Sequence, residues 1–204
     1  LCSSGATTTT SVTVGSTSNR YFFAVTGEYA TAVSFDGVAL TKLNSNILTS
    51  NQGYSFVPNV SVWGLANPST GAKTFSVTTV GGQENVCYGV FTGMDPNQPE
   101  AYVTNQTNGN LVAAQTENIT TVTANAWIIN FIKGTGNSGR TFTAGAATTL
   151  LQAMADSGTT SGSAILQSAT AKATPGAYTV VTNWSSSSGW FSAVTYSVKP
   201  YLTA

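Results

Sequence analysis

Short segments rich in β-branched and aromatic residues alternate along this chain with clusters of Gly, Pro, Asn, Asp and Ser. The clusters recur about every 8 to 12 residues, which is the spacing of strands joined by short turns. No segment sustains the periodicity of an amphipathic helix. The pattern predicts an all-β protein of roughly ten to twelve strands, folded as a two-sheet antiparallel β-sandwich with a jelly-roll-like arrangement.

The clearest strand begins the stretch at residues 84–99. Residues 86–91 are apolar or small at every position, so we expect both faces of this strand to be buried in the middle of a sheet. Residues 93–99 follow and hold a Gly, an Asp, an Asn and two Pro. That density of turn formers predicts a polar loop held by a rigid, buried strand.

Two further segments carry specific expectations. Asp36 and Gly37 lie between two apolar runs and predict a two-residue hairpin turn, because both residue types accept the positive φ angles that such a turn requires. Residues 148–155 place apolar side chains at helical spacing. There we expect a short helical turn or, in preference, a loop that crosses between sheets.

The domain organisation follows from length and composition. With 204 residues and 41% hydrophobic content the chain can bury one sizeable core. Residues 1–11 form a Ser- and Thr-rich tract without periodicity, which we interpret as a flexible lead or an edge strand. We predict a single β-sandwich domain over residues 12–204.

The surface carries very little charge. Charged residues make up 7% of the chain, and seven basic residues balance seven acidic ones. A zero net charge offers no attraction to nucleic acid or to an anionic membrane. It also removes the repulsion that keeps monomers apart, so we expect a homo-oligomer. No run of 18 apolar residues occurs, so the sequence predicts no membrane-spanning helix.

The residues available for chemistry are few. The chain has no His, the commonest general base and transition-metal ligand, so its many Ser and Thr have no evident activating base. Cys2 and Cys87 cannot complete a zinc site. We favour free thiols, with a disulfide between the two as the alternative, because Cys2 lies at a terminus and Cys87 packs well as a small apolar side chain. The composition favours a protein that is not an enzyme and binds no cofactor or metal.

The polar loop after the central strand is the candidate contact site. Asp95, Asn97 and Glu100 place oxygen atoms close together in sequence, as a calcium site would. Two carboxylates are few for calcium, and the neighbouring prolines favour an ordinary turn that begins at Asp95. A glycosidase would need two carboxylates about 5 to 10 Å apart, which seven scattered acids do not predict. We interpret these three residues as a loop that contacts another protein.

Aromatic residues offer a second candidate site. Tryptophan faces can stack on sugars while amide side chains bond the hydroxyl groups. Most of the tryptophans alternate in phase with Val and Ile, so we expect at least three of the four to be core residues. Trp184, which precedes a Ser-rich segment, is the one that we expect to be exposed. The four residues are Trp63, Trp127, Trp184 and Trp190.

Four segments, in order along residues 12–200, carry a resemblance to known proteins. They are residues 37–42 (GVALTK), 62–71 (VWGLANPSTG), 89–95 (GVFTGMD) and 198–200 (VKP). Together they resemble a poorly characterised family of β-sandwich domains found in bacterial secreted or surface proteins and in phage virion and tail-associated proteins. The resemblance implies a non-enzymatic module used for display, attachment or assembly, with no catalytic residues to carry over.

These observations predict a non-enzymatic structural protein that is extracellular, on a cell surface or on a virion surface. It would act by protein–protein assembly as a coat, cement (decoration) or filament subunit, with copies of itself or another coat or surface protein as partners. The chain begins with Leu rather than Met, which favours processing of an exported protein. The alternative is a carbohydrate-binding or adhesin module that binds glycans through exposed aromatic residues.

Overall fold

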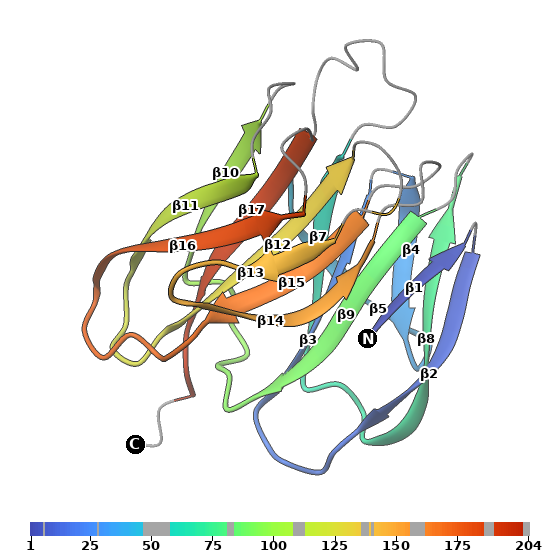
Figure 1. Cartoon of the computed structure of the whole chain (residues 1–204). Coiled ribbons are helices and arrows are strands. Elements are labelled where there is room, and N and C mark those ends of the chain that lie inside the picture. Colours follow the sequence, from blue (N-terminus) through green and yellow to red (C-terminus); the bar gives the residue numbers. More distant parts are fainter. Residues whose placement is uncertain are drawn as a thin grey trace.

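The computed structural model consists of β-strands joined by turns and loops (Figure 1). It describes residues 1–5, 7–27, 29–46, 58–80, 84–107, 113–135, 139, 141–155, 162–185 and 190–201. The strands are β1 (Cys2–Gly5), β2 (Thr7–Val14), β3 (Arg20–Thr26), β4 (Ala30–Phe35), β5 (Val38–Ala39), β6 (Thr41–Asn46), β7 (Val60–Ala66), β8 (Gly71–Thr79), β9 (Glu84–Thr92), β10 (Ala101–Thr107), β11 (Ala114–Thr121), β12 (Trp127–Thr135), β13 (Phe142–Ala144), β14 (Thr148–Met154), β15 (Gly162–Ser168), β16 (Gly176–Trp184) and β17 (Trp190–Val198).

The strands form four sheets. Strands β1 to β9, the first half, make an outer sheet of order β2-β8-β4-β5 and an inner sheet of order β1-β9-β3-β7-β6. Strands β10 to β17, the second half, make an inner sheet of order β10-β17-β12-β15-β14 and an outer sheet of order β11-β16-β13. In Figure 1 the first half is coloured blue to green and the second half yellow-green to red, and the two lie side by side.

Apolar side chains fill the spaces between the sheets. Because side chains alternate across a strand, Phe22 of β3 faces the first outer sheet, where it packs with Phe75 of β8. Phe23 of β3 faces the other way and packs with Phe131 of β12 in a cluster shared by the two inner sheets. Two further clusters lie between the sheets of the second half. The four sheets therefore stack as layers, with the shared cluster at the centre.

The two halves have the same strand order. Replacing β1, β2, β3, β4, β6, β7, β8 and β9 by β10 to β17 in turn converts the sheets of the first half into those of the second. The two-residue strand β5 is the one strand of the described chain without a counterpart. The protein is thus built from two halves of equal topology, packed inner sheet against inner sheet.

Irregularities in strand pairing also occur at matching positions in the two halves. Strand β6 bulges at Leu43 against β7, and strand β14 bulges at Leu151 against β15. Both leucines pack against the central cluster. Asn19 and Asn125, with φ angles of 56° and 59°, stand before β3 and β12 respectively. These shared features allow the residues of the two halves to be matched one by one.

The predicted all-β antiparallel sandwich is confirmed, with four sheets where two were expected. The jelly-roll arrangement and the single domain over residues 12–204 stay predictions. The hairpin turn is confirmed: Phe35 pairs with Val38, and Asp36 and Gly37 have φ angles of 51° and 76°.

Two local predictions are wrong. Residues 148–155 form neither a helical turn nor a crossing loop but strand β14, and the bulge at Leu151 explains the error because it interrupts the two-residue alternation. The Ser- and Thr-rich tract expected to be flexible forms the edge strands β1 and β2, which pair with β9 and β8. The alternative of an edge extension describes it correctly.

Candidate functional site

One side of strand β9 is open beyond its partner β1. Strand β1 pairs with residues 84–87 of β9. Leu1 and Tyr88 then exchange both backbone hydrogen bonds, each with an N to O distance of 2.8 Å. Backbone groups point to alternate sides along a strand, so those of Val90 point to the same side as those of Tyr88. The described residues place no strand there to pair with Val90.

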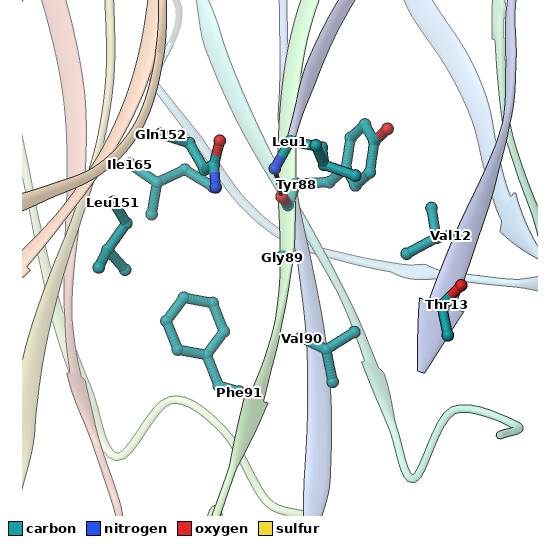
Figure 2. A pocket seen from close by; sticks show the side chains of 10 residues that line it. All are labelled: Leu1, Val12, Thr13, Tyr88, Gly89, Val90, Phe91, Leu151, Gln152 and Ile165. Atoms are coloured by element: carbon teal, nitrogen blue, oxygen red, sulfur yellow. Dashed lines mark hydrogen bonds between the residues drawn. The ribbon is translucent and has the colours of Figure 1, made fainter. Parts of the chain in front are cut away.

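A groove of about 380 Å³ lies along this open side. Figure 2 shows β9 in the middle of the groove, with side chains of β2 on one side and of β14 and β15 on the other. No side chain that lines it is charged. The residues contributed by the flanking strands are Val12, Thr13, Leu151, Gln152 and Ile165.

The centre of the groove is a glycine. Gly89 leaves the backbone of β9 uncovered, and a Cβ atom placed on it would meet just the ring edge of Phe91, at 3.6 Å. A second groove section, of about 360 Å³, shares Phe91 and Leu151 with the first and continues to Trp127. The two sections together follow β9 as one elongated, largely apolar groove.

A disulfide holds β1 in place at one end of the groove. Cys2 and Cys87 are bonded and lie directly opposite each other, with a Cα to Cα distance of 4.0 Å. The prediction of free thiols is therefore wrong. Its error was to treat Cys2 as part of a mobile terminus, whereas pairing of β1 with β9 brings the two residues together. The pair lies between hydrogen-bonded pairs of the ladder, where opposed Cα atoms approach most closely.

The matching place in the second half is filled. Phe23 pairs with Gly89 on β9, and its counterpart Ile129 pairs with Tyr196 on β17. Tyr196 of the second half is therefore the counterpart of Gly89 of the first. Tyr196 is fully buried and donates its hydroxyl to Oδ1 of Asn44 at 2.9 Å. Burial raises the pKa of Tyr196, so the hydroxyl stays protonated as a donor.

Strand β10 also covers this matching edge completely. Its seven residues pair with β17 from Ser197 to Phe191. The ring of Tyr102 on β10 meets that of Tyr196 edge to face, with centroids 6.5 Å apart. Among the described residues, the first half thus has a groove beside Gly89 where the second half has a seven-residue strand and a buried aromatic ring.

The predicted contact loop is the connection between the two halves, and its acids are used internally. The Asp95 carboxylate accepts a hydrogen bond from the Asn97 amide at 2.8 Å and lies 3.2 Å from Nζ of Lys199. Glu100 accepts bonds from the amide of Thr123 at 3.2 Å and from its hydroxyl at 2.7 Å. Asp95 and Asn97 are together, while Glu100 binds a different segment, so the three do not form one ligand set.

The pKa values of both acids reflect these contacts. The Asn97 amide, aided by Lys199, holds the pKa of Asp95 below its usual 3.8. Burial acts to raise the pKa of Glu100, but hydrogen bonds from Ser197 and Thr123 outweigh it and lower the pKa below 4.5. Across the described ranges no group of three or more Cys, Asp or Glu side chains is placed to hold a metal ion.

Another carboxyl group lies inside the second half. Glu117 is 2% exposed and accepts a hydrogen bond from Nε2 of Gln115 at 2.7 Å. Desolvation raises its pKa from 4.5 to about 7, against the opposing effect of that bond. Glu117 projects from β11 between two sheets rather than into a cleft, so its chemistry concerns stability.

The expected exposed aromatic residue is buried. Trp184 is 4% exposed and packs against Phe142 and Phe191, with ring centroids 4.3 Å and 5.2 Å away. It follows the alternation of β16 into the core, which the Ser-rich segment after it obscured in the sequence. The expectation that at least three of the four tryptophans are core residues is confirmed, because Trp63 and Trp190 are buried as well. Residues 186–189 of the Ser-rich segment lie outside the described residues.

Comparison of the chain with models of protein families, with curated proteins and with solved structures gives no match. The resemblance to β-sandwich domains of secreted and virion proteins therefore stays a prediction that rests on the four sequence segments. Within the described residues no helix is long or apolar enough to cross a membrane.

Sequence reasoning found strand β9 but missed its open edge. The apolar run at residues 86–91 indicated burial on both faces, yet it said nothing about which strands lie beside β9. Gly89 was the available signal, because a glycine inside a strand often marks a place where another chain segment approaches closely. Leu151 and Gln152 come from the other half of the chain and had no signal of their own.

Proposed function

We propose that this protein is a non-enzymatic structural subunit that assembles with other proteins outside the cell or on a virion surface. The observation that carries the proposal is the largely apolar groove along β9, which no charged side chain lines. Apolar surface in contact with water is stabilised when another chain buries it, so such a groove favours contact between subunits. The groove rather than the loop at Asp95, Asn97 and Glu100 is then the main contact surface.

Two further observations support this function and its location. The 7% charged residues leave few charges to oppose contact between subunits. The disulfide between Cys2 and Cys87 suits an oxidising environment, such as the outside of a cell or the surface of a virion. Both carboxylates of the loop are satisfied within the molecule, so Asn97, which is exposed, is the member of that loop left for contacts.

Assembly is tested by sedimentation velocity at several concentrations and by electron microscopy. We expect species larger than the monomer, and we expect Thr13→Arg to reduce them because it places a charged side chain in the groove. Thr9→Arg is the matched control, since Thr9 is an exposed residue of the same strand that does not line the groove. A strict monomer at every concentration, with no ordered packing, contradicts the proposal.

The alternative function is carbohydrate binding or adhesion. Its expected platform, Trp184, is buried, so exposed tyrosines would have to replace it. Tyr102 and Tyr201 are 54% and 45% exposed and supply aromatic faces at the surface. A glycan array that gives a hit, lost in Tyr102→Ala, would favour this alternative over assembly.

A further inference from the structure

We propose that Gln115 and Glu117 form a pH-sensitive switch in the core of the second half. With a proton on Glu117, the carboxyl group and the carboxamide hold β11 against β10 and β17. Loss of that proton places a charge in the core and favours opening of this corner of the sandwich to water. The switch goes beyond the proposed assembly and does not depend on it. It rests on the geometry of the pair, on its uncharged surroundings and on its place at an edge.

Within the described part of the chain, the Gln115 carboxamide has one oxygen, Oε1, that no donor reaches. Both side chains are buried, and Nε2 of Gln115 donates to Oε1 of Glu117 at 2.7 Å. A carboxylate accepts hydrogen bonds but cannot donate one, whereas a protonated carboxyl group can. A proton on Glu117 would therefore supply the missing donor, and the acid and the amide would exchange two hydrogen bonds. Because a buried acceptor without a donor is costly, this geometry favours the neutral form.

The strands that pack against β11 offer Glu117 no stabilising cation. These strands are β10, β12, β16 and β17. Lys133 of β12 is the one Lys or Arg among their residues, and its Nζ donates to the Asn85 carbonyl at 3.1 Å. Other titratable side chains on these strands or on the adjoining turns have contacts elsewhere or face solvent, and they are Tyr178 (hydroxyl to Thr174), Tyr196 (hydroxyl to Asn44), Glu100 (to Thr123), Lys172 (over the Tyr178 ring) and Tyr102 (54% exposed). Glu117 is thus the group of this core that changes charge near neutral pH, since desolvation raises its pKa to about 7.

The pair lies where two edge strands meet (Figure 1). Strand β10 is an edge of the inner sheet and β11 is an edge of the outer sheet, and each is hydrogen-bonded to one neighbouring strand of its sheet. A side chain joins them, because Nδ2 of Asn105 on β10 donates to the backbone oxygen of Thr116 at 3.2 Å. A charge on Glu117 is costly while it is buried. Separation of β10 from β11 would bring water to it without disrupting the central cluster, so local opening relieves the cost.

Two measurements on the intact protein test the switch. Infrared difference spectra should show the band of a protonated carboxyl group at about pH 5 that is lost by about pH 8.5. Amide exchange, corrected for its intrinsic dependence on pH, should become at least about tenfold faster in β10 and β11 over the same range, because the opened state binds the proton less tightly. Strands β1 and β2 are the internal control, since Thr8 and Thr10 occupy the places of Gln115 and Glu117 and carry no carboxyl group.

Three variants separate the switch from packing. Glu117→Gln keeps a carboxamide in place and should remove both the band and the pH dependence of exchange. Gln115→Leu keeps a side chain of similar size but removes the donor to Glu117, so the carboxyl band should move to higher frequency. Thr120→Val changes an exposed residue of β11 and should leave both measurements unchanged. A role of Gln115 in packing alone would not move the band.

The switch is overturned if the natural protein shows no protonated carboxyl band at about pH 5, or if exchange in β10 and β11 stays constant while the band is lost. It is also overturned if Glu117→Gln keeps the pH dependence, or if β1 and β2 loosen to the same extent, because opening would then not begin at Glu117. The measurements on the natural protein decide the first two points even if a variant fails to fold.

Discussion

The edge of β9 and the edge of β17 occupy matching places in two halves of the same strand order, yet within the described residues their neighbouring strands cover them to different lengths. Strand β10 pairs with seven residues of β17, whereas β1 pairs with four residues of β9 and is joined to it by a disulfide. The ring of Tyr196 fills a space in the core of the second half, whereas its counterpart Gly89 has no side chain to fill the matching space in the first half. Equal topology therefore does not imply equal surfaces, because the ring of Tyr196 fills a space that Gly89 leaves as part of a groove.

The cores of the two halves differ as well. Thr10 pairs with Phe75 in the first half, and its counterpart Glu117 pairs with Val180 in the second. The first half thus places a hydroxyl where the second buries a carboxyl group. The buried carboxyl group makes the stability of the second half sensitive to pH.

Removing the Tyr196 ring from the core of the second half should cause the largest loss of stability. Tyr196→Gly removes a fully buried ring and should lower the free energy of unfolding by about 5 kcal/mol, measured by urea denaturation. Tyr196→Phe should cost about 1 kcal/mol, because it removes the hydrogen bond to Asn44 alone. If the two variants lose similar stability, the ring is not what closes the second half.

Loss of the disulfide should affect the first half selectively. Cys2→Ser opens a covalent loop with a sequence separation of 85 residues and should cost about 4 kcal/mol, with faster amide exchange in β1 and unchanged exchange in β10. Reductant should reproduce this loss in the natural protein and have no effect on the variant. Equal loosening of β1 and β10 would show that the halves do not hold their edge strands independently.

Glu117→Gln should stabilise the protein at high pH. The raised pKa of about 7 means that the folded state binds a proton that the unfolded chain releases near 4.5, so stability falls as the pH rises between these values. At pH 8 the variant should gain about 3 kcal/mol, and at pH 4 it should match the natural protein. A gain that does not vary with pH would mean that burial of the charge is not the cause.

Glu100→Gln should show the opposite dependence on pH. The pKa of Glu100 is lowered in the folded state, so its contribution is present above 4.5 and is lost as the pH falls through the folded pKa. The variant should cost about 1 kcal/mol at pH 7, because it weakens the bonds from Thr123 and Ser197, and nothing well below the folded pKa. A loss that persists in strong acid would point to packing of the connection between the halves.

Much of the fold could be predicted from local pattern. Alternation in the strands and the Asp36-Gly37 turn predicted an all-β antiparallel sandwich and one hairpin correctly. The bulge at Leu151 defeated the same reasoning, because an extra residue shifts the alternation without a distinctive residue type. Trp184 was misplaced because a neighbouring Ser-rich segment was given more weight than the phase of its own strand.

The candidate site could be predicted only in part. The strand that forms its floor was identified, since burial on both faces leaves a continuous apolar run. Its walls could not be found, because Val12 and Leu151 are far from Gly89 in sequence and meet it only after the sheets have stacked. The match between the halves was hidden too, since the same strand order is reached with different side chains at most core positions.

Residue type and a period of two are sufficient to predict that this chain forms strands, that each strand buries one face or both, and that the surface carries almost no charge. Long-range packing is what brings the strands into two matching halves, joins Cys2 to Cys87 and forms the groove along β9 beside Gly89. These are outcomes of long-range pairing, in which hydrogen bonds between backbones join segments whatever their side chains are. For that reason these outcomes cannot be predicted from any local pattern in the sequence.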